Sequence, residues 1–282
     1  MKPILTDIYP KSLATYLGFT VVVCIITAVL SYGYLKLSKV AEILGISTIP
    51  ALDITQSGSL FHWLTAVLWL LTATACFAIS QETFRYNKTH SKSELSDIWF
   101  WGGLAAVFLS IDSVAMLRLL LRDLLVIHGG ARLGEQGNLW WIGIYTILFG
   151  MIVTRITAEI WRCYSVSALL FSTSILLLLA AAITTMDNIP SVKQLTEQLT
   201  AEQITAASNA ISVVGILLIT ISLSLFTRRL SIPDATTNQH WLESISKTSK
   251  TTPPPTEKPT AIKQDSNTPQ IIESPEDLAK KR

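Results

Sequence analysis

Long apolar stretches recur along the chain, separated by segments that are richer in polar residues. Six of them approach the length of about 20 apolar residues that an α-helix needs to cross the hydrocarbon core of a bilayer. No water is available there, so backbone amides and carbonyls must bond within their own segment, which favours helices. The pattern therefore predicts spanning helices at about 16–36, 59–80, 98–121, 139–161, 165–185 and 208–226.

Composition indicates the same class of protein. Hydrophobic residues make up 50% of the chain and charged residues only 15%, whereas soluble domains carry about 25% charged residues. The formal net charge of +2 is too small to indicate nucleic acid as a partner. We therefore expect an all-α, polytopic membrane helix bundle over residues 1–230, embedded in the lipid bilayer.

The chain changes character after residue 230. The stretch TSKTTPPPTEKPTAIKQDSNTPQ is rich in Thr, Pro, Ser and Lys and poor in large apolar residues. Such a segment buries too little surface to offset its conformational entropy. We expect 231–282 to form a disordered tail that can recruit a cytoplasmic protein partner.

The distribution of lysine and arginine predicts the orientation. An even number of spans places both termini on one side, and the loops of that side carry more Lys and Arg than those of the other side. Cytoplasmic loops are enriched in these residues, so we expect a protein of the cell (inner) membrane with both termini in the cytoplasm. Several tryptophans fall at span ends, where indole rings prefer the headgroup level: Trp99, Trp101, Trp140, Trp141 and Trp161.

A helix-start signal precedes the last span. In the segment SVKQLTEQLTAEQITAA, residues 191–207, the tetrad Thr200-Ala-Glu-Gln203 has the form of a capping box. It predicts a short interfacial helix that leads into the last span.

Asp112 is the residue that costs most energy in an apolar setting. If the third span begins near Ile98, Asp112 lies about 21 Å along it, at or past the middle of a core of about 30 Å. A carboxylate at such depth costs about 2.5–3.5 kcal/mol. The expected hydrogen-bond partners are Ser110, Ser113 or hydroxyls of the fifth and sixth spans. Asp112 is either a satisfied interhelical contact or a functional site on a cation, proton or solute path.

Two arginines follow Asp112 on the same apolar run. On a continuous helix Arg118 points about 240° away from Asp112 and Arg122 lies about 15 Å further along the axis, so neither would pair with it. Both share a face and can extend toward the outer headgroups. A second register, 104–127, remains open, and it would bring Arg118 close to the midplane.

The fourth span carries a second charged group. Arg155, Glu159 and Arg162 follow at spacings of four and three residues, which stacks them on one helix face. Glu159 is therefore expected to be neutralised on its own helix.

No cofactor or metal site is indicated. Cys24, Cys76 and Cys163 are odd in number and show no paired spacing. His62 is expected to be interfacial, and His128 stands alone in the sequence of a glycine-rich loop. We expect no catalytic residue among these.

The segment FRYNKTHSKSELSDIWFWGGLAAVFLSIDS, residues 84–113, resembles uncharacterised multi-pass membrane proteins of planctomycete-type bacteria. Tyr86, His90, Trp99, Ser110 and Asp112 carry the resemblance. The loop has fewer arginines than that family and lacks its paired aspartates. The resemblance implies a location in the cell membrane and no particular activity.

Three functions remain open. The first is a non-enzymatic interaction or scaffold component that recruits partners through its tail. The second is a small-solute or ion transporter that uses Asp112, although none of the six spans contains the mid-depth proline of many transporter helices. The third is an intramembrane enzyme, which would need a nucleophile–base pair or metal ligands that one aspartate does not supply.

Overall fold

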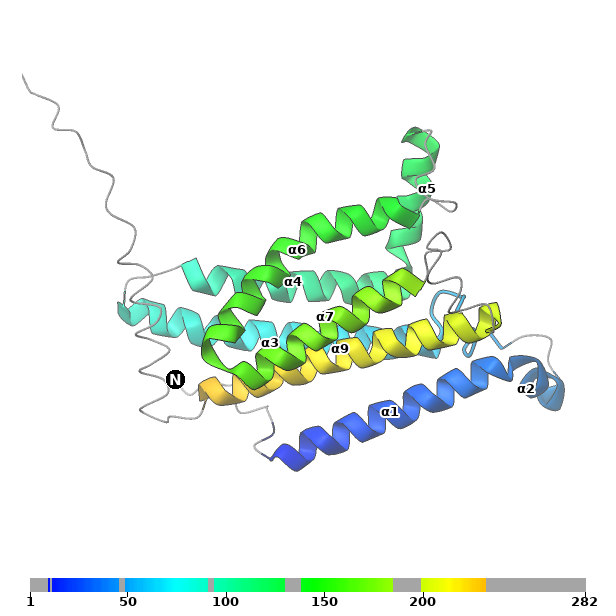
Figure 1. Ribbon diagram of the computed structural model, residues 1–282, viewed down its shortest axis with the longest axis horizontal. Helices are drawn as coiled ribbons and strands as arrows, with labels where there is room; N and C mark the ends of the chain where they lie inside the picture. The colour runs from blue at the N-terminus through cyan, green and yellow to red at the C-terminus, as the bar shows by residue number, and fades with distance from the viewer. Residues whose placement is uncertain are drawn as a thin grey trace, which may run out of the picture. The chain divides into compact units, whose positions relative to one another are not determined.

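The computed structural model describes residue 10 and residues 12–45, 49–90, 94–129, 138–184 and 199–231. All of them belong to the first of two compact units, Met1–Trp241; the second unit, Leu242–Arg282, and thus the predicted disordered tail beyond Ser231, lies outside the described residues. The regular secondary structure in these ranges is helical (Figure 1), with the elements α1 Leu13–Leu35, α2 Leu37–Leu44, α3 Leu60–His90, α4 Glu94–Ala115, α5 Leu117–Gly129, α6 Asn138–Cys163, α7 Ser165–Thr184 and α9 Ala201–Ser231.

Six of the described helices are long and apolar enough to cross a membrane. The apolar parts are Leu13–Leu35, Leu60–Phe84, Asp97–Ala115, Ile142–Arg162, Ser165–Thr184 and Ala201–Leu230. The predicted all-α, multi-pass fold is confirmed.

The third span differs from both registers predicted for it. The apolar run that was expected to continue to 121 or 127 is broken at Met116, and the span ends at Ala115. Met116 has φ 52°, a left-handed conformation that costs a non-glycine residue about 1–2 kcal/mol. After it, α5 runs steeply across the direction of the long helices (Figure 1), and its 13 residues are too few to cross a bilayer.

Five helices form a closed ring of neighbours. α3 packs along α4, α4 contacts α6, α6 contacts α7, α7 packs along α9, and α9 contacts α3. α1 lies outside this ring, against α9 (Figure 1). The pairs α3–α4 and α7–α9 pack most extensively, whereas α6 touches its neighbours more lightly. The ring can therefore hold a space between its helices.

α9 is the most buried of the spanning helices, and small hydroxyl residues fix it to its neighbours. The Thr72 and Thr220 hydroxyls lie 2.9 Å apart between α3 and α9, and the Ser222 hydroxyl donates to the Ser167 carbonyl on α7 at 2.7 Å. Small residues let membrane helices approach closely, and their hydroxyl groups hydrogen-bond across the interface.

A glycine sets the close approach of α3 and α4. A Cβ atom built on Gly103 would lie 2.5–2.8 Å from three ring atoms of Phe77, well inside van der Waals contact. The absence of a side chain at Gly103 therefore lets the Phe77 ring lie against the α4 backbone.

The tryptophans at the span ends differ in burial. Trp99 is only 1% exposed and stacks on Phe226 of α9, with ring centroids 5.5 Å apart, so it packs between helices at the start of its span. Trp101 and Trp161 are exposed. The side chains of Trp140 and Trp141 lie outside the described part.

The predicted capping box is confirmed at the start of α9. The Thr200 amide donates to Gln203 Oε1 at 2.9 Å, and the Gln203 amide donates to Thr200 Oγ1 at 3.3 Å. The helix that it starts is not a separate interfacial one, because α9 continues without a break from Ala201 to Ser231. Residues 191–198 lie outside the described residues.

Candidate binding cavity

Asp112 and Arg118 form an ion pair across the break between α4 and α5. The Arg118 backbone amide donates to Asp112 Oδ1 at 2.8 Å, and Arg118 Nη1 donates to Asp112 Oδ2 at 3.2 Å. The carboxylate is buried, with 3% of Asp112 exposed. The prediction that Arg118 points away from Asp112 is wrong, because it assumed a continuous helix.

The break itself explains this pairing. The Met116 amide still bonds to the Asp112 carbonyl at 2.8 Å, as in a helix, and the chain then turns at the positive φ of Met116. Arg118 becomes the second residue of α5, where the backbone amide has no partner within its own helix. The Asp112 carboxylate accepts a hydrogen bond from that amide and lies at the positive end of the α5 helix dipole. Asp112 therefore acts as a side-chain cap for α5.

The other partners of Asp112 also differ from those predicted. Ser110 donates to the Ala66 carbonyl on α3 at 2.9 Å, and Ser113 donates to the Leu109 carbonyl on its own helix at 2.7 Å. The hydroxyl of Tyr145, on α6, is a hydrogen-bonding neighbour of the Asp112 carboxylate. The ion pair and Tyr145 therefore connect three helices: α4, α5 and α6.

A cavity of about 760 Å³ lies inside the five-helix ring, and Asp112 and Arg118 line it. Ligand pockets commonly enclose about 300–1,000 Å³. On α9 the lining extends from Ser208 to Leu223, which corresponds to about 22 Å of helix at 1.5 Å per residue. The cavity therefore reaches deep into the apolar layer.

Polar and apolar side chains line opposite ends of this cavity. The polar end lies where α3, α6 and α9 begin and α4 ends, and it includes His62, Asp112, Arg118, Tyr145 and Asn209. The apolar end lies deeper and includes Trp69, Ile156, Phe171, Ile219 and Leu223. The cavity thus has the polarity of an amphiphilic molecule.

His62 also belongs to the polar end of the cavity. It is buried, and its Nδ1 lies 3.0 Å from both Ser59 Oγ and the Gln56 carbonyl oxygen. The imidazole lies within electrostatic range of Asp112 and Arg118. The polar end therefore combines side chains from most of the ring, and the sequence had indicated only Asp112 and Arg118 among them as candidate site residues.

The remaining charged candidates are paired away from this cavity. Arg122 Nε contacts Asp123 Oδ1 at 2.8 Å on the exposed side of α5. Glu159 Oε1 lies 3.9 Å from both Arg155 Nε and Arg162 Nη1, the arrangement that their spacing predicted. These long distances make loose ion pairs, and Glu159 is buried while both arginines are exposed.

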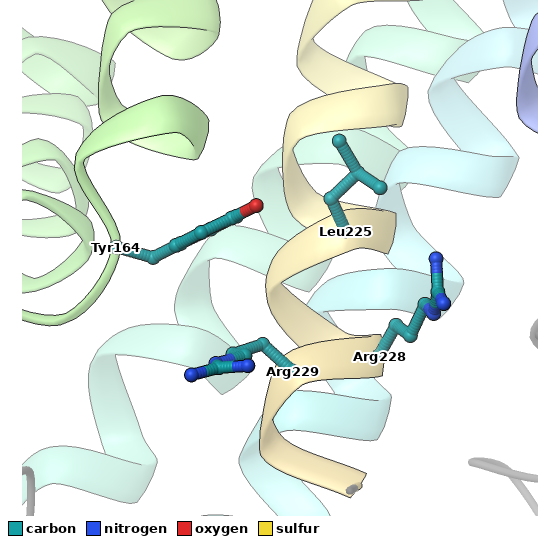
Figure 2. A pocket seen from close by; sticks show the side chains of 4 residues that line it. All are labelled: Tyr164, Leu225, Arg228 and Arg229. Carbon is teal, nitrogen blue, oxygen red and sulfur yellow. The ribbon is translucent and has the colours of Figure 1, made fainter. Parts of the chain in front are cut away.

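A second, smaller hollow of about 180 Å³ lies at the opposite ends of the helices, beside the C-terminus of α9. Tyr164, Leu225, Arg228 and Arg229 line it (Figure 2). Tyr164 extends toward α9 and Arg229 lies on the same side, whereas Arg228 points away from Tyr164. Paired arginines at a helix end are expected at the headgroup level of a spanning helix.

Metal-ligating residues do not gather in the described ranges. No group of three or more His, Cys, Asp or Glu side chains there is placed to hold a metal ion. Cys24 is exposed on α1 and Cys76 is buried on α3, and the side chain of Cys163 lies outside the described part. His128 bonds to the Leu124 carbonyl on its own helix at 3.0 Å.

Fold and cavity together define an integral, multi-pass membrane protein, with six apolar helices among the described residues and a charged pair in its interior. No family model, curated protein or solved structure matches the chain.

Proposed function

We propose that this protein binds a small amphiphilic molecule inside the membrane, as a transporter or carrier does. The cavity of about 760 Å³ within the ring of α3, α4, α6, α7 and α9 carries this proposal. Its polar residues would hold the headgroup of the ligand, and its apolar residues would surround the tail. Binding sites of this kind are mostly apolar, with a few polar groups that fix orientation.

The helix break at the end of the third span supports a transport role. Transporter sites are often built where spanning helices are discontinuous, because free backbone groups and helix ends can then face a ligand. The break at Met116 places the α5 N-terminus beside the cavity. It arises without a proline or glycine, so a helix end faces the cavity without the mid-depth proline of many transporter helices.

The scaffold hypothesis rests on different residues. Its support is the Pro-rich, mixed-charge composition of the tail, which lies outside the described residues. It remains a prediction, as do the resemblance to planctomycete-type membrane proteins and the cytoplasmic location of both termini. Ligand binding in the cavity and recruitment of a protein partner by the tail do not exclude each other.

Binding can be tested with the tryptophan that lines the apolar end. The protein is placed in nanodiscs of zwitterionic lipid and titrated with C18 amphiphiles brominated at mid-chain, carrying sulfate, hydroxyl or ammonium headgroups. A bound chain brings bromine close to Trp69, so we expect a saturable decrease of fluorescence with at least one headgroup. The variant Trp69→Phe should lose the saturable part and keep the linear part that comes from lipid-exposed tryptophans.

A matched pair of variants on α7 tests whether the cavity is the site. Ala182 lines the cavity, whereas Ala180 is exposed on the same helix. Ala182→Phe should weaken saturable binding, because the ring occupies ligand space, and Ala180→Phe should leave it unchanged. No saturable quenching with any headgroup, or equal effects of the two variants, would overturn the proposal.

A further inference from the structure

We infer that the ligand of this cavity is an anionic amphiphile, with its headgroup bound by Arg118 and its apolar chain extending between α3, α6, α7 and α9. This inference rests on the proposed function and names the chemical class of its ligand. It depends on which hydrogen-bonding groups of the polar end are already occupied.

The Asp112 carboxylate is occupied from three directions. Oδ1 accepts a hydrogen bond from the Arg118 backbone amide, and Oδ2 accepts one from Arg118 Nη1. The Tyr145 hydroxyl is a further neighbour of the carboxylate. A cationic headgroup would have to displace Arg118 and leave a guanidinium without its counter-ion in a largely apolar setting, which costs several kcal/mol. Asp112 is therefore suited to hold Arg118 in place rather than to bind ligand.

Arg118 has donor capacity beyond this pair. A guanidinium group carries five N–H donors in a planar fork that matches carboxylate, sulfate and phosphate oxygens. One of them, on Nη1, bonds to Asp112, and the Arg118 side chain, 30% exposed, lines the cavity. Asp112 fixes the orientation of the fork, so an anion can be bound without further ordering of the side chain.

The rest of the lining agrees with this ligand class. Asp112 is the one acidic side chain among the described residues that line the cavity, and its charge is offset by Arg118. Asn209 adds a neutral donor at the same end, because its side-chain nitrogen carries two hydrogens and donates to the Thr205 carbonyl. Deeper in the cavity, Trp69, Phe171 and Leu223 offer an apolar surface for one chain.

The three brominated amphiphiles distinguish this inference from the proposed function. We expect the sulfate to bind most tightly, because only an anion gains charge-assisted hydrogen bonds from Arg118. Arg118→Gln should weaken sulfate binding about 10- to 150-fold, the change that loss of one hydrogen bond to a charged group produces, and should leave the alcohol nearly unchanged. Arg122→Gln is the matched control, because Arg122 lies one turn further along α5 and pairs with Asp123.

Asp112 serves as a second probe of the same site. Asp112 is a positioning residue in this inference. Asp112→Asn should therefore weaken sulfate binding less than Arg118→Gln does, because Asn retains an oxygen acceptor for the Arg118 amide. Equal affinity for all three headgroups, or sulfate binding unaffected by Arg118→Gln, would overturn the inference while leaving the proposed function intact. Preference for the ammonium probe, lost in Asp112→Asn, would show instead that Asp112 binds a cation. If the unsubstituted protein shows no saturable binding with any of the three headgroups, both this inference and the proposed function are overturned.

Discussion

Asp112 and Arg118 lie six residues apart on what would be opposite faces of one helix, yet Arg118 donates two hydrogen bonds to the Asp112 carboxylate. The left-handed turn at Met116 makes this possible. The pair offsets two costs at once, the burial of a carboxylate and the unpaired amide at the start of α5. It also fixes a guanidinium group at the polar end of the cavity.

Breaking this pair should destabilise the bundle. Exposed ion pairs contribute about 0–1 kcal/mol, whereas removing one partner of a fully buried pair costs about 3–5 kcal/mol. Arg118 is 30% exposed, so we expect an intermediate cost of about 1–3 kcal/mol for Asp112→Leu. Equilibrium unfolding of the purified protein in mixed micelles measures this change in the free energy of unfolding.

A double-mutant cycle isolates the interaction. Asp112→Leu and Arg118→Leu should each lower the free energy of unfolding. The double variant should lose less than the sum of the two single losses, because it leaves no unpaired charge. The pair Asp112→Leu and Arg122→Leu should be additive. Additivity for both pairs would show that Arg118 does not stabilise Asp112.

Met116 should respond to substitution according to its backbone conformation. At φ 52° glycine is unstrained, whereas a β-branched residue is strongly disfavoured. We expect Met116→Gly to retain or raise the free energy of unfolding. Met116→Val should lower this free energy by about 1–2 kcal/mol or more. The reverse order in thermal unfolding would show that the chain continues as a helix through this position.

The long spans were predictable because a single physical requirement dominates them. Each apolar stretch must satisfy its backbone inside the lipid, so length and hydropathy indicated six helices without knowledge of their neighbours. The capping box at Thr200 and Gln203 and the loose pairing of Glu159 were also predictable, since three- and four-residue spacings on one helix are local. These features form within single helices.

The polar end of the cavity depends on tertiary structure. Neither proline nor glycine marks the break at Met116. The prediction from the sequence therefore assumed a continuous helix, on which Arg118 points away from Asp112. Tyr145 and Asn209 lie in separate spans, and only the ring of helices brings them to the cavity that Asp112 lines. A usable signal was present: His62, Tyr145 and Asn209 all lie in the first third of spans that start on the same side.

The contact between Gly103 and Phe77 should be sensitive to a single methyl group. Gly103→Ala places a Cβ atom within 3 Å of the Phe77 ring, and overpacking of this kind costs about 1–3 kcal/mol. Phe77→Leu should restore part of the lost thermal stability in the double variant. Gly143→Ala is the control, because a Cβ there meets no atom within 4 Å. Equal effects of both glycine substitutions would contradict close packing between α3 and α4.

The capping box predicts a separate effect at the start of α9. Thr200→Ala removes the acceptor of the Gln203 amide, and loss of such a cap costs about 0.5–2 kcal/mol. Thr205→Ala is the matched control, because Thr205 bonds back to the Ala201 carbonyl within the same helix. Faster amide hydrogen exchange over the first turn of α9 in Thr200→Ala, but not in Thr205→Ala, would report this local loss.

Truncation after Ser231 separates the two roles considered for the protein. α9 ends at Ser231 and the described lining of the cavity ends at Leu223, so deletion of 232–282 should leave saturable quenching by the brominated sulfate unchanged. If the tail recruits a cytoplasmic protein, the same deletion should abolish recruitment, measured by proximity labelling from a tag on the N-terminus in cells. The variant Arg118→Gln with an intact tail should show the opposite pattern, with weaker probe binding and normal recruitment. Recruitment that survives the deletion would count against the scaffold hypothesis, and quenching that disappears with the tail would show that the five-helix ring does not bind ligand on its own.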